Sequence, residues 1–522
     1  MELESEEETM ASQTIEAIKA EKDGLDVLAD IYRYARLGFD AIDPDDYDRM
    51  KWYGLFHRKQ TPGFFMMRLR LANGIVSSEQ LRVIAGIARD FGRGAADLTT
   101  RQNIQLRWIT IESVPEIFER LHRAGLSCQQ TGMDNYRNVV GCPIAGLDRE
   151  EVFNAAPIAQ SVSLAMLGRE FSNLPRKFNI SISGCRHDCG HSRANDIGLT
   201  PAVKQIDGFP VYGFHAAIGG ALGGTWPQLA QPLNIFLRPE QALMFCRAVL
   251  SVFRDHGLRE KRTEARLKWL IKEWGLERFM AQVERVFGQP FMSAGECLLT
   301  EHSGDHLGVH PQKRAGFVYV GLHVPVGRTN ADQLDQLADL AEMYGSGELR
   351  LTSDQNVIIP NVHEAILPDL LKEPLLQVLR PDPPGPLRGL VCCTGKDFCH
   401  FALSDTKGLA HQIAQELAAL LPHDRRVDIR VSGCVHACGQ HHVGQIGLQA
   451  QRVRLPGGEI VDGFDLFVGG DHTRLAELKA RKIPVDQIAR RIVEELALMD
   501  EMTRCRVMEP TSLQEVLLSE AG

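Results

Sequence analysis

The sequence lacks the features that would place the protein in a membrane, on a nucleic acid or around a dinucleotide. No apolar run approaches the roughly 20 residues that a membrane-spanning helix needs. The formal net charge of -9 shows no basic excess, so the bulk charge gives no reason to expect a nucleic acid as partner. No G-x-G-x-x-G motif follows a predicted strand, which argues against a nicotinamide or flavin domain.

The N-terminus also lacks the character of a targeting segment, because its first residues, MELESEEETM, are acidic where such segments are basic or poor in acid. We therefore expect a cytoplasmic protein. Twelve cysteines in 522 residues do not make the dense disulfide framework of a small secreted domain, so we expect reduced thiols that are free to bind metal. A chain of this length, 44% hydrophobic, can build about three or four domains.

The most informative feature of the chain is an internal duplication. A stretch beginning at Pro62, PGFFMMRLRLANG, is matched without a gap 253 residues later by AGFVYVGLHVPVG. The same offset aligns LTTRQN at residues 98–103 with LTSDQN at residues 351–356. A second block, ISGCRHDCG at residues 182–190, is matched 249 residues later by VSGCVHACG. Two matched blocks in the same order predict two copies of one structural unit.

Each copy is predicted to begin with a strand, a helix and a second strand. Residues 64–71 alternate apolar side chains with arginines, as in a half-buried strand. Residues 78–91 carry apolar side chains at helical spacing, with a serine in place as N-cap, and residues 104–111 form the second strand. The second block of each copy enters a cysteine loop from a β-rich run, at residues 178–183 and 427–431.

The cysteines of the second copy have the spacing of a metal site. Cys393 and Cys399 form C-x5-C, and Cys434 and Cys438 form C-x3-C, with Cys434 35 positions after Cys399. Four soft thiolates suit a cubane iron–sulfur cluster, and the nearby glycines let backbone N–H groups approach its sulfides. The same thiolates would also close a tetrahedral zinc site, although structural zinc sites usually have shorter C-x2-C pairs. Spacing alone favours iron–sulfur and leaves zinc as the alternative.

The residues around these cysteines, CTGKDFC and SGCVHACGQHHVGQIGL, resemble the cluster and sirohaem signature of the nitrite and sulfite reductase family. The resemblance is strongest to its ferredoxin-dependent nitrite reductases, which are internally duplicated in the same way. It covers nearly all of residues 51–470. Five further segments carry it in family order: KWYGLFHRK, FMMRLRLANG, LTTRQNIQLR, MDNYRNVVG and NLPRKFNISISG.

The resemblance implies an α+β (mixed α/β) fold in two halves. Each half would have a small ferredoxin-like α+β domain and a larger α/β domain that binds sirohaem and the cluster. The expected divisions in chain order are a lead-in at 1–55, a ferredoxin-like domain at 56–125, a sirohaem and substrate domain at 126–300, a second ferredoxin-like domain at 301–378, and the cluster and sirohaem domain at 379–522.

The resemblance also assigns roles to single residues. It makes Cys438 both a ligand of the 4Fe-4S cluster and the bridge to the sirohaem iron, with Cys393, Cys399 and Cys434 as the other ligands. It places Arg68, Arg137 and Lys177 around the substrate. Fixed positive charge there suits an anion and its more basic reduced intermediates. The cations expected to pair with the sirohaem carboxylates are Arg101, Arg107, Arg266 and Lys268.

The substrate expectation depends on Asn179. In the family, sulfite-reducing members tend to have a second lysine at this place, whereas plant-type nitrite reductases have asparagine. One cation fewer suits the single charge of nitrite, so we expect six-electron reduction of nitrite to ammonium. Assimilatory sulfite reduction on the same scaffold is the alternative, and outside enzymes the alternative is an iron–sulfur electron carrier. A cobalamin-pathway enzyme of the same superfamily is disfavoured because such chains tend to be shorter.

The electron donor is expected to be external, since the chain shows no nicotinamide or flavin motif. The resemblance implies reduced ferredoxin or a similar one-electron carrier. An acidic carrier needs a basic docking patch near the cluster, for which Lys396, Arg452 and Arg454 are candidates.

Cysteines of the first copy occupy the places of the cluster ligands. Cys142, Cys185 and Cys189 align with Cys393, Cys434 and Cys438, whereas Asp148 stands in the place of Cys399. Because Asp rarely ligates a cubane, a relic loop is the favoured interpretation and a second metal site the alternative. The remaining thiols are expected to be ordinary core or surface groups: Cys128, Cys246, Cys297, Cys392 and Cys505. The loop histidines are expected to be hydrogen-bonded or to meet cofactor carboxylates, with zinc less favoured: His187, His191, His436, His441 and His442.

Overall fold

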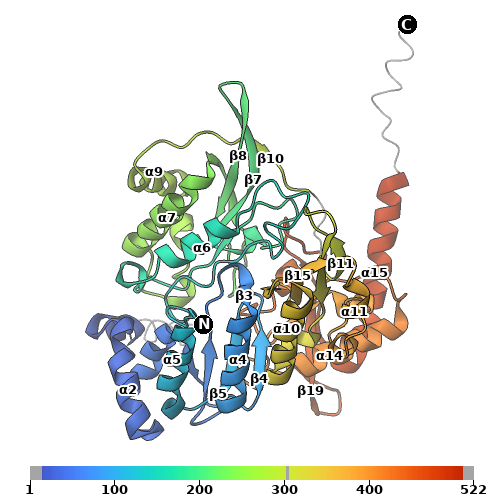
Figure 1. Cartoon of the computed structure of the whole chain (residues 1–522), viewed down its shortest axis with the longest axis horizontal. Coiled ribbons are helices and arrows are strands. Elements are labelled where there is room, and N and C mark those ends of the chain that lie inside the picture. Colours follow the sequence, from blue (N-terminus) through green and yellow to red (C-terminus); the bar gives the residue numbers. More distant parts are fainter. Residues whose placement is uncertain (1–13, 301–304, 509–522) are drawn as a thin grey trace.

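The computed structural model describes residues 14–300 and 305–508, with the side chains of the last turns from residue 502 left out. Within these residues the strands form four five-stranded sheets. Two belong to a pair of small units and two to a pair of large units (Figure 1). The acidic N-terminal run and the side chain of Cys505 lie outside the described residues.

The two small units are antiparallel sheets that exchange a strand. The first has the order β1-β2-β5-β4-β13 and the second β11-β12-β15-β14-β3. β13 comes from the second copy yet pairs with β4 of the first, and β3 of the first copy pairs with β14 of the second. The bounds are Leu55–His57 (β1), Phe65–Arg68 (β2), Ile75–Ser77 (β3), Ala95–Leu98 (β4), Ile104–Ile109 (β5), Gly308–Pro311 (β11), Phe317–Leu322 (β12), Arg328–Asn330 (β13), Glu348–Leu351 (β14) and Val357–His363 (β15).

One helix of each copy follows the exchanged strand. α4 (Ser78–Phe91) begins after Ser77, whose hydroxyl caps the Gln80 N–H while the Gln80 side chain reaches back, as a capping box. α10 (Ala331–Tyr344) begins in the same way after Asn330. The two helices lie side by side (Figure 1), and buried side chains of both copies form one continuous core. The predicted helix and the duplication are confirmed, whereas the strand exchange was not predicted.

The two large units mix parallel and antiparallel strands. In the second copy the order is β16-β17-β18-β19-β20, with β16, β17 and β18 parallel. In the first copy β6 runs parallel to β7, and the counterpart of β16 shrinks to a single parallel bridge between Val140 and Ser181. The bounds are Ile180–Ile182 (β6), Ile197–Ile206 (β7), Phe209–Ile218 (β8), Gln231–Leu237 (β9), Glu296–Cys297 (β10), Leu390–Cys392 (β16), Ile429–Ser432 (β17), Ile446–Arg454 (β18), Ile460–Val468 (β19) and Glu477–Pro484 (β20).

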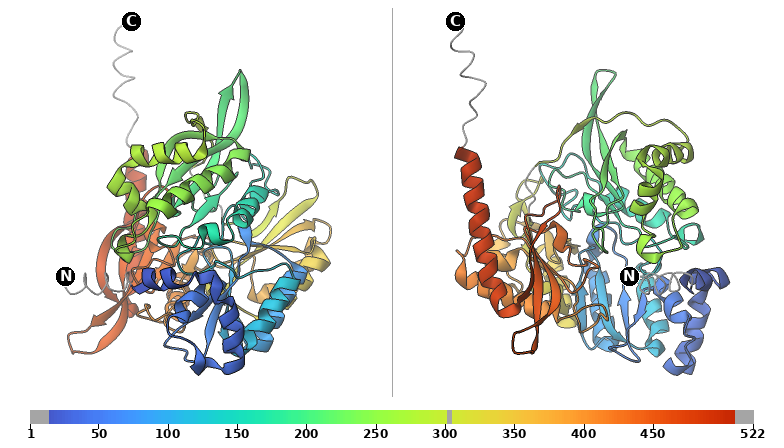
Figure 2. Two further views of the ribbon diagram at one scale, coloured as in Figure 1. Left: turned by 90° about the vertical axis from the view of Figure 1, so that its left-hand side faces the viewer. Right: turned by 180° about the vertical axis from the view of Figure 1, so that it is seen from behind.

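Helices cover the large sheets on their outer sides. The helices of the first copy surround a core of its own, and α15 lies along the outside of the second copy (Figure 2). The longer helices are α2 (Leu28–Leu37), α5 (Val114–Arg123), α6 (Ala156–Ala165), α7 (Ala242–His256), α8 (Leu267–Trp274), α9 (Leu276–Phe287), α14 (Thr406–Leu420) and α15 (Val485–Met508). No helix in the described ranges is long and apolar enough to cross a membrane.

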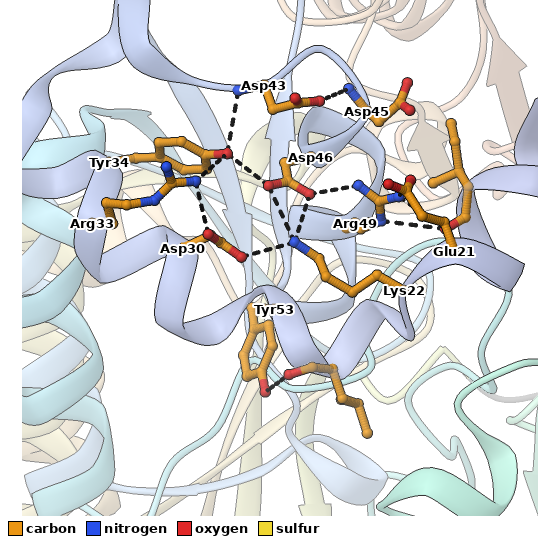
Figure 3. Close-up of polar contacts among 12 residues, drawn as sticks. Glu21, Lys22, Asp30, Arg33, Tyr34, Asp43, Asp45, Asp46, Arg49 and Tyr53 are labelled. Atoms are coloured by element: carbon orange, nitrogen blue, oxygen red, sulfur yellow. Dashed lines mark hydrogen bonds and ion pairs between the residues drawn. The ribbon is translucent and has the colours of Figure 1, made fainter.

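The N-terminal segment is held by a buried carboxylate, Asp46. The Tyr34 hydroxyl donates to Asp46 at 2.7 Å, Arg49 Nη1 donates at 2.8 Å, and Lys22 lies 3.2 Å away (Figure 3). Burial opposes ionisation of Asp46, but these three donors together hold its pKa below the usual value.

A second anchor joins this segment to the first large unit. Residues 14–21 are helical, and Lys19 Nζ lies 3.2 Å from the carboxylate of Asp134 and 3.1 Å from the carbonyl of Leu174. Asp134 also accepts two hydrogen bonds from Arg262, at 2.8 and 2.9 Å. The loop that carries Arg137 is therefore held from both sides.

Candidate functional site

The four cysteines of the second copy lie at one edge of the β16–β20 sheet. β16 and β17 are parallel, so their carboxyl ends meet at the same edge. Cys393 directly follows β16, and Cys434 lies two residues beyond β17. Loops that leave adjacent parallel strands converge there, which is why ligands bind at this edge of such sheets. Two pairs of cysteines that are 35 positions apart in the sequence are thus brought together at one edge of the sheet.

Local contacts prepare this loop for anionic sulfur. The Gly433 N–H donates to Cys393 Sγ at 3.1 Å, and Thr406 Oγ1 lies 3.6 Å from the same sulfur. Gly439 is required by space, because a Cβ there would meet the carbonyl oxygen of Val431 at 2.0 Å. Hydrogen bonds to the sulfurs and a close backbone are what an iron–sulfur site needs.

The separation of the sulfurs favours a cluster over zinc. A tetrahedral zinc ion with Zn–S bonds of about 2.3 Å requires sulfurs about 3.8 Å apart. No three of these four sulfurs lie within 4.8 Å of one another. The four thiols are still near enough to affect one another, since burial and then the charges of Cys438, Cys399 and Cys393 raise the pKa of Cys434 to about 12. The donor set and its size fit a 4Fe-4S cluster, whose irons would supply the positive charge that keeps the thiolates ionised.

Cys438, the exposed member of the four, opens into a cavity between the two copies. The second copy contributes Cys438, His436 and Gln440 to its lining. The first copy contributes the cationic and polar side chains, namely Thr100, Arg101, Lys177, Asn179, Asn195 and Arg266. The tertiary structure therefore brings five of the predicted site residues around one space, although they come from both halves of the chain.

The cations in this cavity are held close together at an electrostatic cost. Burial, followed by Arg266 and Arg101, lowers the pKa of Lys177 well below its usual value. Burial also lowers the pKa of Arg101, and the Cys438 thiol partly opposes this shift. Cations that share a buried space in this way favour a bound anion, which relieves their mutual repulsion.

Asp196 is hydrogen-bonded to two of the residues that line the cavity. Its Oδ2 accepts 2.7 Å from Arg266 Nη2 and 2.8 Å from the backbone N–H of Asn179. The Asn179 side-chain oxygen then accepts from Arg101 Nε at 3.3 Å. Arg266 Nε is buried and has no partner among the described residues. A carboxylate-bearing group such as sirohaem fits this arrangement, since unsatisfied buried guanidinium donors call for an anionic acceptor.

Arg68 and Arg137 lie beside the cavity. Arg68 ends β2, donates to the Thr131 carbonyl at 3.0 Å, and has its guanidinium 4.6 Å from the ring centre of Phe56. Burial, then the charges of Arg101 and others, lowers its pKa to about 9. Arg137 is buried, donates to the Met133 carbonyl at 2.7 Å, and its pKa is lowered by burial and by Arg68 and Arg101.

Two further predicted cofactor partners have other contacts. Arg107 donates to Asp97 at 2.6 and 2.9 Å and to Thr394 in the cluster loop at 2.7 Å, so its guanidinium is already paired. Lys268 is buried against the carbonyl of Ala221 at 3.3 Å, and burial, then Arg266, lowers its pKa to about 8. Their roles toward a sirohaem carboxylate stay predictions.

Sequence reasoning did not assign two residues that the structure places at this site. Thr100 Oγ1 donates to the backbone carbonyl of Cys438 at 3.2 Å across the two copies. Arg58 lies near enough to Cys399 and Cys438 for their charges to raise its pKa against the larger, opposing effect of burial. Both belong to segments that carried the family resemblance, LTTRQNIQLR and KWYGLFHRK, and this was the available signal.

The thiols of the first copy also come together. The sulfurs of Cys185 and Cys189 lie 3.4 Å apart, with Cys142 and a histidine that was not predicted, His306, next to them. Among the other cysteines, Cys128, Cys246 and Cys392 are buried and Cys297 is exposed. His191 is hydrogen-bonded to Gln440 at 2.9 Å, as expected for a loop histidine.

Comparisons with known proteins agree with this architecture. Residues 57–124 and 310–376 match the nitrite/sulfite reductase ferredoxin-like half domain, and residues 132–291 and 386–497 match the nitrite and sulphite reductase 4Fe-4S domain. Each domain occurs twice, which confirms the predicted fold class of two ferredoxin-like and two larger units. The second 4Fe-4S match spans all four cysteines of the cluster site.

Proteins that are similar over most of this chain point to the same family. The chain is 46% identical over 463 residues to a ferredoxin–nitrite reductase of Synechococcus elongatus, covering 87% of this chain and 90% of that protein. It is 39% identical over 502 residues to the chloroplastic ferredoxin–nitrite reductase of Spinacia oleracea, covering 92% of this chain and 84% of that protein. Among solved structures, the NirA protein of Mycobacterium tuberculosis matches with a TM-score of 0.84 and 30% identity over 92% of both chains.

Proposed function

This chain belongs to the nitrite and sulphite reductase family and is an oxidoreductase, and from that premise we propose that it reduces nitrite to ammonium with electrons from ferredoxin. The reaction would take place at a sirohaem that shares Cys438 with the 4Fe-4S cluster. The observation that carries the proposal is the cavity in which exposed Cys438 meets Lys177, Asn179, Arg101 and Arg266.

When bound, a 4Fe-4S cluster and a sirohaem would supply electrons to the substrate one at a time. The chain's own part begins with Cys438. Its backbone carbonyl is held by Thr100 at 3.2 Å, so the loop that carries the thiolate is fixed from the opposite copy. A thiolate held in this way is suited to join the two groups without moving during turnover.

The basic side chains bind and orient the anion. Lys177 lines the cavity, while Arg68 and Arg137 lie beside it with their guanidinium groups buried or half-buried. Burial, then the charges of Arg266 and Arg101, lowers the pKa of Lys177, and an anion bound in the cavity would raise that pKa again and favour the protonated Nζ. Lys177 is therefore the residue best placed to hold a proton close to the substrate.

Asn179 supports nitrite over sulfite. A lysine in its place would face the Arg101 guanidinium, which now donates to the Asn179 oxygen at 3.3 Å. The neutral amide keeps the number of cations matched to one negative charge on the substrate, whereas sulfite near neutral pH is present both as a monoanion and as a dianion. Sulfite reduction on the same scaffold is the second outcome that assays must separate.

Ferredoxin would dock over the loop between Cys393 and Cys399. Lys396, in the middle of that loop, is exposed and lies three residues from each ligand. Arg452 and Arg454 are also exposed, but Arg452 is paired with Asp462 across the β18–β19 hairpin. Lys396 thus offers an exposed cation in the cluster loop itself, which suits an acidic one-electron carrier.

The test is the anaerobically purified protein. Its absorption spectrum should show a chlorin-type Soret and red band, and nitrite should be reduced to ammonium with reduced methyl viologen and with reduced ferredoxin. A spectrum without chlorin bands would remove the sirohaem proposal. Faster turnover of sulfite than of nitrite would move the assignment to sulfite reduction. A Lys396→Glu variant should lose activity with ferredoxin but keep it with methyl viologen, which needs no docking site.

A further inference from the structure

A second group of metal-ligating side chains lies in the first copy, apart from the cluster. Cys142 follows the Val140 bridge as Cys393 follows β16, and Cys185 and Cys189 follow β6 as Cys434 and Cys438 follow β17. The duplication has therefore placed three thiols at the matching edge of the other large sheet. All three are buried.

His306 completes this group from another part of the fold. Its Nε2 lies 3.0 Å from Cys189 Sγ, and it precedes β11 in the second copy. The ligand atoms of Cys142, Cys189 and His306 all lie within 4.8 Å of one another, and Cys185 Sγ is 3.4 Å from Cys189 Sγ. Two thiols and one imidazole thus share one buried space, and the third thiol, that of Cys185, lies directly beside Cys189.

The spacing has the size of one ion. Ligands of a tetrahedral zinc ion lie about 3.5–3.8 Å apart, given Zn–S bonds of about 2.3 Å and Zn–N bonds of about 2.0 Å. The distances of 3.0 and 3.4 Å are slightly shorter and are reached by small side-chain rotations. The four cluster cysteines of the same protein, with no three sulfurs inside 4.8 Å, show the wider spacing of a cubane.

A disulfide and a cluster explain the group less well. A disulfide bond is about 2.05 Å long, so Cys185 and Cys189 are not bonded, and pairing them would leave Cys142 and His306 unexplained. Asp148, which stands in the place of the fourth cluster ligand, accepts from the Glu150 N–H at 3.0 Å and is not among the ligand atoms that lie within 4.8 Å of one another. The first copy has therefore exchanged a distant fourth ligand for His306.

Outer contacts orient the ligands as metal sites require. The backbone N–H of His187 donates to Cys185 Sγ at 3.2 Å, which stabilises a thiolate. The second ring nitrogen of His306, Nδ1, lies 3.5 Å from the Tyr319 hydroxyl, leaving Nε2 for the sulfur side. Cys189 and His306 also line a cavity that offers a path for an ion.

We propose that Cys142, Cys185, Cys189 and His306 bind one zinc ion in a tetrahedral Cys3His site that joins the first large unit to the second small unit. Three thiolates, one imidazole and no vacant position are the features of a structural site, so the ion would hold the two copies together without taking part in electron transfer. The neighbouring ion pair of Asp305 with Arg388 (3.0 Å) fixes the segment that presents His306.

The experiment is metal analysis of the full-length protein, expressed with both iron and zinc in the medium and purified anaerobically. We expect about one zinc per chain, and at the zinc edge X-ray absorption should give three sulfurs at about 2.3 Å and one nitrogen at about 2.0 Å. Zinc below about one tenth per chain, or a shell of oxygen ligands, would overturn the proposal. So would iron beyond that of the cluster and haem in place of zinc.

Variants separate this site from misfolding and from the reductase proposal. His306→Phe should lower zinc at least tenfold, whereas His306→Cys should retain it as a four-sulfur site. Cys246→Ser, at a buried thiol inside α7, is the matched control and should keep the full zinc content. If zinc were unchanged in His306→Phe, the assignment of ligands would be wrong. The zinc content does not depend on which oxyanion is reduced, so the two proposals can fail independently.

Discussion

Replacing Asn179 with lysine is the sharpest test of how the cavity distinguishes its anions. Asn179 is buried, with 7% of its surface exposed, and its side-chain oxygen accepts a hydrogen bond from Arg101 Nε at 3.3 Å. Lysine at this position would add a fourth cation to those of Lys177, Arg101 and Arg266. Repulsion among these cations destabilises the site before an anion binds. This cost is the same for both anions, so it cancels in the ratio of the kcat/KM values for sulfite and nitrite.

The size of the expected change in specificity follows from the one extra negative charge that the sulfite dianion carries relative to nitrite. At about 5 Å from the added ammonium group, that charge gains about 0.8 kcal/mol at the dielectric of water and about 3.3 kcal/mol at an effective dielectric of 20. These energies correspond to a rise of about fourfold to about 300-fold in the sulfite-to-nitrite ratio of kcat/KM. We expect about tenfold, because the cavity is open on one side and is partly screened.

The assay compares kcat/KM for both anions with reduced methyl viologen, per mole of sirohaem bound. Asn179→Met is the matched control, since it removes the amide without adding charge and should leave the ratio within about twofold. Added salt should reduce the effect in the lysine variant, as expected for a charge interaction near solvent. The reasoning is refuted if the lysine variant keeps its sirohaem and the wild-type ratio, or if the control shifts the ratio equally.

Three other predictions concern stability and the cluster loop. Asp97→Asn should lower the free energy of unfolding by about 3–5 kcal/mol, measured by urea denaturation, because the buried carboxylate pairs with three cations from three elements. Gly439→Ala should empty the cluster site in an iron and sulfide analysis, since its Cβ would strike the Val431 carbonyl, whereas Gly457→Ala, with nothing within 4 Å, should retain the cluster. The folded pKa of Asp46 is lowered, so its contribution to stability is present above the unfolded pKa of about 3.9 and is lost as pH falls through the folded value. The difference in unfolding free energy between the wild type and Asp46→Asn should therefore be constant from pH 7 to about pH 4.5 and shrink below it; a difference that grows on acidification would contradict this.

Local patterns carried most of the information about the elements. The apolar spacing of residues 78–91 and their serine cap predicted α4 to the residue, because a helix and its capping box involve only nearby groups. The repeat at 253 residues predicted a second helix of the same kind, which is α10. The spacing of Cys393, Cys399, Cys434 and Cys438 predicted the cluster site for a similar reason, since each pair lies within one short loop.

Contacts between distant segments could not be predicted in this way. The exchange of β3 and β13 between the two small sheets could not be predicted, because the sequence of each is that of an ordinary short strand. The strand with which each one pairs depends on how the two halves of the chain pack together. The pairing of Arg107 with Asp97 was missed for the same reason. The periodicity of apolar residues predicts which face of a helix or strand is buried, but not which other element packs against that face.

The duplicated fold could be predicted from the amino-acid sequence alone, and the same local spacings and motifs led to the proposal of the four cluster ligands and of the basic residues around the cavity. Only the tertiary structure decided that Cys438 opens onto Lys177 and Asn179 of the other copy, and that His306 rather than Asp148 joins the thiols of the first copy. The sequence shows which residues are able to bind a metal or an anion. It does not show which of these residues lie close enough together to form one site, because that depends on the distances between them in the folded protein. Those distances are set by how the two large units, each with a core of its own, pack onto the small units, whose buried side chains form one shared core.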